Sequence, residues 1–177
     1  IPNNDVPSKP ENMTNREYGF LVGVLVGDGC YTPHAISKNV IRISSHADEH
    51  EWNETLTNAF AKVGAEKMYT YVNEGSRSMM MDPKPGRVVA NWVKSLPLQP
   101  ARGPEKQLPD VYINSNREFL EGLVDGLFST DGSVDLQSNH FYLPAEHTEH
   151  TENFPRLSEF FCGLTKSARR KRLSINF

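Results

Sequence analysis

Two aspartates, Asp28 and Asp131, carry the chemistry that this sequence suggests first. They lie 103 positions apart, and each one ends an apolar run and is followed by a glycine. Two carboxylates held side by side repel each other unless a cation lies between them, so such a pair favours a metal site. The two runs that precede the aspartates would have to bring both acids to one place.

Small residues recur every four positions in both runs, which puts them on one face of a helix. They are Gly19, Gly23 and Gly27 in the first run, and Gly122, Gly126 and Thr130 in the second. A glycine inside a helix costs about 1 kcal/mol relative to alanine, and close approach of a second helix is the usual reason for several together. The spacing predicts two helices that pack on each other and end together.

Length and composition are those of an ordinary globular protein. The chain has 177 residues, of which 37% are hydrophobic and 23% charged, and its longest apolar run (20–26) is too short to cross a bilayer. No secretory signal is visible, and two cysteines, Cys30 and Cys162, fit a reducing compartment. We therefore expect an intracellular protein, cytoplasmic or organellar, with no membrane partner.

The charge balance argues mildly against a nucleic-acid partner. Net charge is -3, whereas nucleic-acid-binding domains are usually basic. The basic residues are nevertheless concentrated in one run, 166–172, which would be a solvated tail or a phosphate contact.

Helical and strand patterns divide the chain into an extended lead-in (1–13) and a first unit (14–96). Thr14 or Asn15 can cap the first helix, with Glu17 in its first turn. The elements expected in this unit are a helix to Gly27, strands over 31–36 and 40–45, a helix over 49–63, a hairpin over 66–72 and 77–81, and a helix opened by Pro85.

The same order begins again after a proline-rich linker (97–113). A second unit, 114–177, is predicted to hold a helix to Thr130, two short strands and a helix over 149–162. The chain is therefore an internal duplication whose second copy is truncated, without its closing strand and helix. It does not begin with Met, and we expect an excised or processed piece.

The segments 21–29 and 124–132 resemble the two motif copies of a LAGLIDADG homing endonuclease, and the run-up 119–123 is similar to that of intein-encoded members. The resemblance implies an α+β fold of two pseudo-symmetric αββαββα units, whose curved antiparallel sheets form a DNA-binding saddle. It implies a monomer that hydrolyses phosphodiesters on both strands of a long, asymmetric double-stranded DNA site, as in intron or intein homing. The residues that intein splicing would need are not at the ends of this chain.

The resemblance also assigns the metal site. Asp28 and Asp131 would each bind metal in one of two active sites, and the backbone oxygens of Gly27 and Thr130 would complete the ligand set. The expected metal is Mg²⁺, for which Mn²⁺ or Ca²⁺ can substitute.

Two further residues have family-like positions. Lys84, just before the third helix, would polarise the attacking water or stabilise the transition state, and its counterpart would lie beyond Phe177. His46 occupies roughly the place of a polar, water-binding side chain. An exposed turn lysine and a plain surface histidine are the alternatives.

Strand faces would contact DNA. The candidate contacts on or beside predicted strands are Lys38, Arg42, Lys67, Arg77 and Lys166, and Arg169 and Arg170 would contact the phosphate backbone. Taken singly, each strand residue is more typical of an ordinary surface charge than of a base contact.

Three competing functions share this fold. They are a DNA-binding regulator that does not cleave, an RNA-splicing maturase and a decayed endonuclease. A zinc site at the histidine pairs 46/50 and 147/150 is disfavoured, because no cysteine lies near either pair.

Overall fold

The computed structural model describes residues 6, 8–101, 105–130, 133–135 and 140–142, in two compact units, 1–131 and 132–177. In the second unit, strands β5 (Ser133–Asp135) and β6 (His140–Tyr142) pair antiparallel. The helix predicted over 149–162 and the strand over 172–177 lie outside the described residues. All of the following concerns the first unit.

Helix α1 (Asn15–Gly27) begins and ends where the sequence predicts. The Thr14 hydroxyl accepts a hydrogen bond from the Glu17 N–H, and the Glu17 carboxylate accepts one from the Thr14 N–H, which is a reciprocal capping box. The Lys62 ammonium also pairs with Glu17 and lowers its pKa below the ordinary value. These contacts stabilise the start of α1, whose apolar side chains are buried over most of its length.

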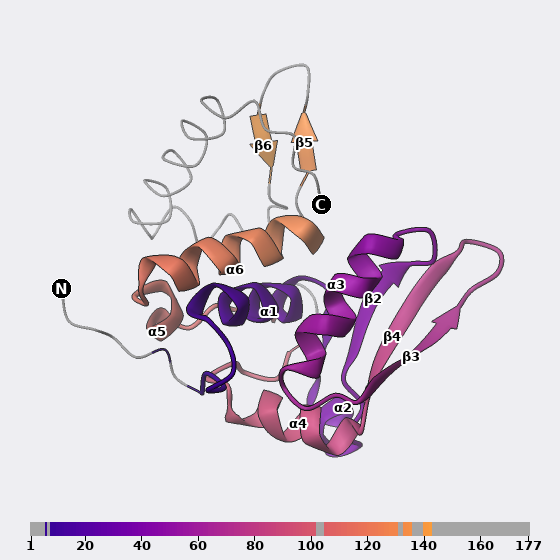
Figure 1. The fold of residues 1–177 in the computed structure, drawn as a ribbon, viewed down its shortest axis with the longest axis horizontal. Helices are drawn as coiled ribbons and strands as arrows, with labels where there is room; N and C mark the ends of the chain where they lie inside the picture. The colour runs from indigo at the N-terminus through magenta and orange to yellow at the C-terminus, as the bar shows by residue number, and fades with distance from the viewer. Residues whose placement is uncertain (1–5, 7, 102–104, 131–132, 136–139, 143–177) are drawn as a thin grey trace. The chain divides into compact units, whose positions relative to one another are not determined.

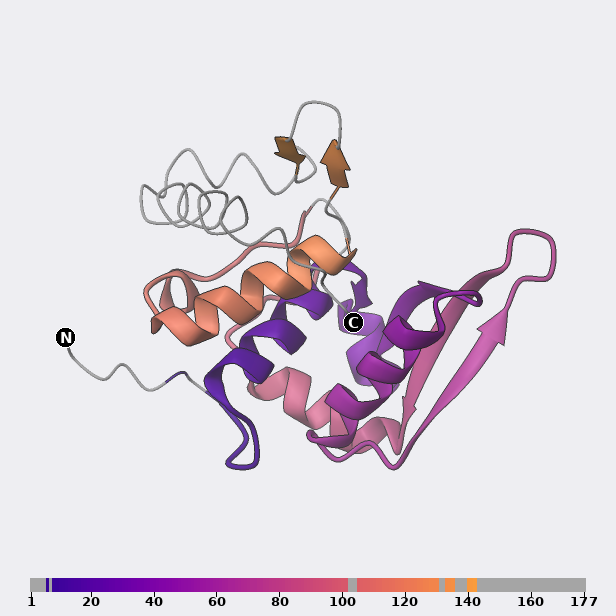
Figure 2. The same cartoon turned by 45° about the horizontal axis from the view of Figure 1, so that its top comes forward.

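Helix α6 (Arg117–Thr130) packs along α1, and Figures 1 and 2 show the two ribbons side by side. The glycines permit this close approach. A Cβ atom built at Gly19 would lie 2.0 Å from the Phe119 carbonyl oxygen, and one at Gly122 would lie 1.9 Å from the Arg16 carbonyl oxygen. The predicted close crossing of the two helices is confirmed.

The contacts are reciprocal. A Cβ at Gly23 would lie 2.4 Å from the Leu123 carbonyl oxygen, and one at Gly126 would lie 2.2 Å from that of Phe20. Adding 103 to the α1 residue of one contact and subtracting 103 from its α6 residue gives the other contact, and the same holds for the contacts at Gly19 and Gly122. The helix pair therefore has a local pseudo-two-fold relation. Because residue numbers rise together along both helices, α1 and α6 run in the same direction.

A four-stranded antiparallel sheet follows α1, with the strand order β1-β2-β4-β3. Its strands are β1 (Gly29–Cys30), β2 (Arg42–His46), β3 (Lys67–Val72) and β4 (Ser78–Lys84). Helices α3 (His50–Ala61) and α4 (Gly86–Ser95) pack on it, and bury Leu56 and Val89 with the sheet residues Ile43 and Met81. The predicted hairpin and both helices are confirmed.

One predicted strand, 31–36, is wrong. Residues Pro33–Ser37 form a short helix, α2, between β1 and β2. The Thr32 hydroxyl accepts a hydrogen bond from the Ala35 N–H, and Pro33 at the first helical position has the φ that a helix needs. This local start outweighs the strand pattern, so the chain has α2 where the αββαββα order has none.

The segment predicted as a linker contains helix α5 (Asp110–Ile113). Tyr112 is fully buried, stacks on Phe119, and places its hydroxyl 3.2 Å from that of Tyr18. Burial raises the pKa of Tyr18 to about 12. The domain boundaries themselves stay a prediction, and the observed fold class is mixed α+β. No helix in the described ranges is long and apolar enough to span a membrane.

The helix crossing yields a stability prediction. Gly23→Ala should lower the free energy of unfolding by about 1–3 kcal/mol or more, because the new methyl group meets a backbone carbonyl of α6 that cannot move away alone. Gly75→Ala is the matched control, since its Cβ would meet nothing closer than 3.6 Å. Denaturant unfolding of both variants measures the difference, and equal stabilities would rule out the tight crossing.

Candidate metal and DNA-binding site

The C-terminal end of α1 presents Gly27 and Asp28, both half-buried. The Asp28 N–H donates to the Val24 carbonyl at 3.0 Å, and the Asp28 carbonyl accepts from the Ser44 N–H of β2 at 3.2 Å. The backbone at Asp28 is thus fixed between helix and sheet. The end of a helix carries partial negative charge and carbonyls without helical partners, so this position favours a cation.

Thr130 ends α6 as Gly27 ends α1. Each of them follows the tight crossing at Gly23 and Gly126 by four residues, a rise of about 6 Å. The helices run in the same direction, so both ends lie on the same side of the crossing. Asp131 lies outside the described residues, and its approach to Asp28 stays a prediction.

Lys106 is the site residue that sequence reasoning missed. Its ammonium group donates a hydrogen bond of 2.5 Å to the Gly27 carbonyl oxygen and lies 5.5 Å from the centre of the Tyr31 ring. The side chain is only 6% exposed, although it comes from the predicted linker. Nothing in the local sequence distinguishes it, because the contact joins residues 79 positions apart.

Tyr31 provides the apolar wall beside this ammonium. It is 1% exposed, and burial raises the pKa of its hydroxyl above the ordinary value. The Tyr31 ring face and the Gly27 carbonyl oxygen are both electron-rich groups that attract an ammonium ion. The end of α1 therefore already accepts one cation from the protein itself.

Lys84 is not brought to the same place. The Asp28 carbonyl accepts a hydrogen bond from the Ser44 N–H of β2. Ser44 pairs with Met80 of β4, and Lys84 lies four residues farther along that strand. Strand β2 separates β1 from β4. With about 3.3 Å per residue and about 4.8 Å between strands, the backbones at Asp28 and Lys84 are roughly 16 Å apart.

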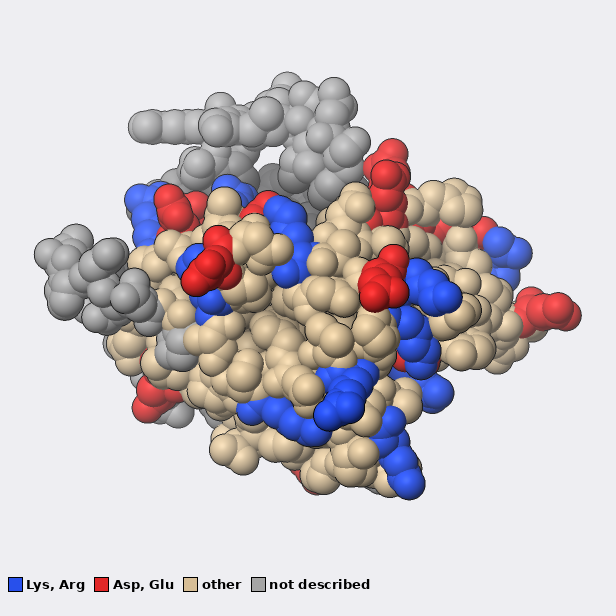
Figure 3. Space-filling view, turned by 60° about the horizontal axis from the view of Figure 1, so that its bottom comes forward, with Lys and Arg blue, Asp and Glu red and all other residues tan. Residues whose placement is uncertain are grey.

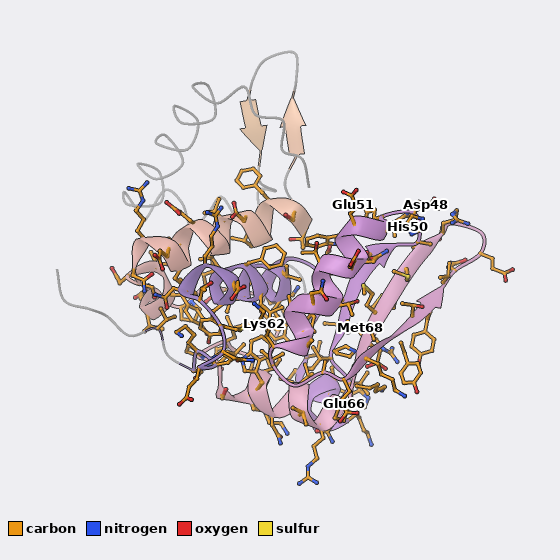
Figure 4. All side chains as sticks on the ribbon, in the orientation of Figure 1. Asp48, His50, Glu51, Lys62, Glu66 and Met68 are labelled. Carbon is orange, nitrogen blue, oxygen red and sulfur yellow. The ribbon has the colours of Figure 1, made fainter. Side chains whose placement is uncertain are left out.

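Figure 4 shows the two ends of the sheet. Asp48 and His50 lie at one end, and Glu66, whose N–H donates to the Lys84 carbonyl at 2.7 Å, lies at the other. The catalytic assignment of Lys84 stays a prediction, but it would require the active site to reach along the sheet.

Basic and aromatic side chains share the sheet face that α3 and α4 leave open. Arg42 reaches across β4 to the Tyr71 ring, 6.0 Å from its centre, and Lys67 lies 4.9 Å from the Tyr69 ring centre. The tyrosines are 45% (Tyr69) and 55% (Tyr71) exposed. The neighbouring Lys67 ammonium lowers the pKa of Tyr69.

The other candidate DNA contacts lie elsewhere. Lys38 caps the end of α2 and is exposed, and Arg77 lies in the β3–β4 turn. Arg77 pairs with both carboxylate oxygens of Asp48, at 2.9 and 3.0 Å, and holds the pKa of Asp48 below its usual value. Lys166, Arg169 and Arg170 lie outside the described residues. Figure 3 shows Lys and Arg side chains gathered across the lower part of one face.

His46 ends β2, where its Nδ1 accepts a hydrogen bond from the Asp48 N–H at 3.3 Å. It stays a candidate polar residue at the sheet edge. Within the described part of the chain, no three His, Cys, Asp or Glu side chains lie together as a metal-binding group. A metal ion at Asp28 would therefore also need backbone oxygens or a carboxylate from beyond those residues.

The residues at the end of α1 fit a hard divalent cation. The Asp28 carboxylate and the Gly27 carbonyl are oxygen ligands of the kind that Mg²⁺ prefers. The Gly27 oxygen has two lone pairs, so it can accept Lys106 and still bind a metal.

Comparison with known proteins gives two distant relatives. The chain is 26% identical over 120 residues to a DNA polymerase of Thermococcus sp. (strain GE8), and 25% identical over 118 residues to that of Thermococcus hydrothermalis. Each match covers 66% of this chain and 7% of the polymerase. No family model matches the chain. The comparisons therefore establish a weak similarity to a small part of these polymerases.

The burial of Lys106 can be tested without any assumption about function. Among the described lysines it is the one that is buried, so an amine-acetylating reagent should modify it most slowly. Exposed Lys38 and Lys94 serve as internal references, and mass spectrometry of a time course gives the three rates. Modification of Lys106 as fast as Lys94 would contradict its contact with Gly27.

Proposed function

We propose that the chain is a metal-dependent, site-specific endonuclease of the LAGLIDADG type that cuts double-stranded DNA. The reciprocal backbone contact of α1 and α6 carries this proposal, because it supports two motif helices that end together with one acid each. Mg²⁺ held at these acids would supply Lewis-acid stabilisation of the scissile phosphate and an activated water. The pseudo-symmetric second unit and the DNA-binding saddle belong to the same proposal.

Lys106 has the position of the basic residue in this mechanism. A buried ammonium beside Gly27 adds a fixed positive charge next to the proposed metal ligands. Preorganised charge of this kind stabilises negative charge that develops on phosphate oxygens. We propose this role for Lys106 at the first active site, in preference to Lys84.

The open sheet face would bind the duplex. Exposed tyrosines and cations together suit contacts with phosphates and base edges. The net charge of -3 is compatible with DNA binding by this face. The acids Glu49 and Glu51 lie at the start of α3, whereas the cations Arg42 and Lys67 lie on the open sheet face.

The distant relatives fit an intein-type origin. A match that covers 7% of a DNA polymerase concerns a segment much smaller than the whole protein. An endonuclease domain inserted in a polymerase gene would produce such a match, which agrees with the resemblance to intein-encoded members.

A non-cleaving DNA- or RNA-binding protein of the same fold is the second candidate. The observation that favours it is the Lys106 hydrogen bond to Gly27, because the lysine already occupies an oxygen that a metal would use. A pool of supercoiled plasmids with randomised inserts, incubated with Mg²⁺ or with EDTA, separates the two. Linear plasmids from a subset of sequences in Mg²⁺ alone support the nuclease, and binding without cutting supports the alternative.

Asp28→Asn should abolish double-strand cleavage of a recovered target while DNA affinity changes little. The substitution keeps the size of the side chain but removes the negative charge that a metal requires. Gel analysis of plasmid cleavage and a binding titration measure the two quantities. Linearisation by this variant at the wild-type rate would remove Asp28 from the site.

Lys106→Met should lower the cleavage rate of bound DNA by about 100-fold or more, with an unchanged dissociation constant. Lys94→Met, on the exposed side of α4, is the control and should cut normally. Thermal unfolding of both variants shows whether the fold is retained. A Lys106→Met protein that is folded and fully active would exclude the proposed role.

A further inference from the structure

Asp82 differs from the other charged residues discussed on the open sheet face, because it is acidic and buried. It is only 2% exposed, its Oδ2 lies 2.8 Å from the Lys84 ammonium, and its Oδ1 has no hydrogen-bond partner among the described residues. Burying a carboxylate is costly unless it is paired, so Lys84 is the contact that makes this position tolerable.

The three cations of this face have two kinds of partner. Arg42 and Lys67 lie against tyrosine rings, which leave their full charge available. Lys84 lies against a carboxylate, which compensates its charge. Its side chain remains 32% exposed, so its ammonium can still donate to a ligand.

The backbone of Lys84 is fixed as well. It pairs with Lys67 in the β3–β4 ladder, and its carbonyl accepts the Glu66 N–H at 2.7 Å. A lysine side chain is normally flexible, and it loses rotamer entropy when it binds a ligand. Because the backbone and the ammonium group of Lys84 are both held, most of its rotamer entropy is already lost before a ligand binds.

From this geometry, and resting on the proposed function, we infer that Lys84 reads a base edge of the DNA target and that Asp82 is its positioning residue. A charge-compensated ammonium gains little from a phosphate, whereas a fixed donor can select guanine O6 or N7 over other groups in the major groove. Lys67, with an uncompensated charge, is the phosphate contact of the same face.

The test is a binding selection from a fully randomised duplex pool, with Ca²⁺ in place of Mg²⁺. Wild type should enrich one long sequence. Lys84→Met should lose preference at one or two adjacent base pairs and bind the selected sequence about 5- to 150-fold more weakly. Its salt dependence should not change, whereas Lys67→Met should reduce the slope of log K against log salt by about 1.

Asp82 is tested through Lys84. Asp82→Asn should lose the same base preference and bind with a steeper salt dependence, because the released ammonium can now reach a phosphate. The double variant D82N/K84M, which removes both charges and avoids an unpaired buried one, should show the profile of Lys84→Met. Lys84→Arg keeps the ion pair and a donor that suits guanine, so it should retain the preferred base that Lys84→Met loses, and thermal unfolding checks that each variant folds.

The outcomes separate the two proposals. If wild type enriches no sequence, site-specific recognition and with it the proposed function fail. If wild type enriches a sequence and the Lys84 variants enrich the same one, the assignment of Lys84 and Asp82 is overturned while the proposed function stands. A Lys84→Met protein with an intact base preference and a shallower salt slope would make Lys84 a phosphate contact, which also overturns it.

Discussion

The backbone contact between α1 and α6 is the constraint on which the rest of the first unit depends. Four glycines place carbonyl oxygens of one helix where the Cβ atoms of the other would be, so no other residue type fits without moving a helix. Such Cα–H to carbonyl contacts are individually weak. Their effect is geometric, since they fix the depth and direction of the crossing. The ends of both helices are then held on one side of it, where the proposed acids must meet.

A second consequence is electrostatic. Two helices that end side by side bring together two sets of unpartnered carbonyls and their negative partial charge. The Lys106 ammonium compensates part of this negative charge at Gly27. Lys106 comes from a segment with little regular structure. The lysine has the Tyr31 ring on one side and Gly27 on the other. The proposed metal and the lysine would share the Gly27 oxygen, which has two lone pairs, and the carboxylates of the site would have to offset the repulsion between the two cations.

Local features were predictable and long-range ones were not. The capping box at Thr14, the glycine spacing and the β3–β4 hairpin follow from nearby residues, and all three are observed. Helix α2 was missed because a threonine cap and a proline outweighed a strand-like pattern. The distance of Lys84 from Asp28 depends on strand register, and the contact of Lys106 depends on the path of a linker. The spacing of residues along the sequence predicts neither the distance nor the contact.

The open sheet face shows how a chain of net charge -3 would offer a surface to DNA under the proposed function. Overall charge governs long-range attraction, whereas recognition depends on where single donors are held. Tyr69 and Tyr71 hold cations without neutralising them, and Asp82 holds one while neutralising it. A face built only from uncompensated cations would bind any duplex tightly. Mixing the two kinds of support would lower non-specific attraction and leave the directional contacts in place, which is the balance that the proposed site-specific endonuclease would require.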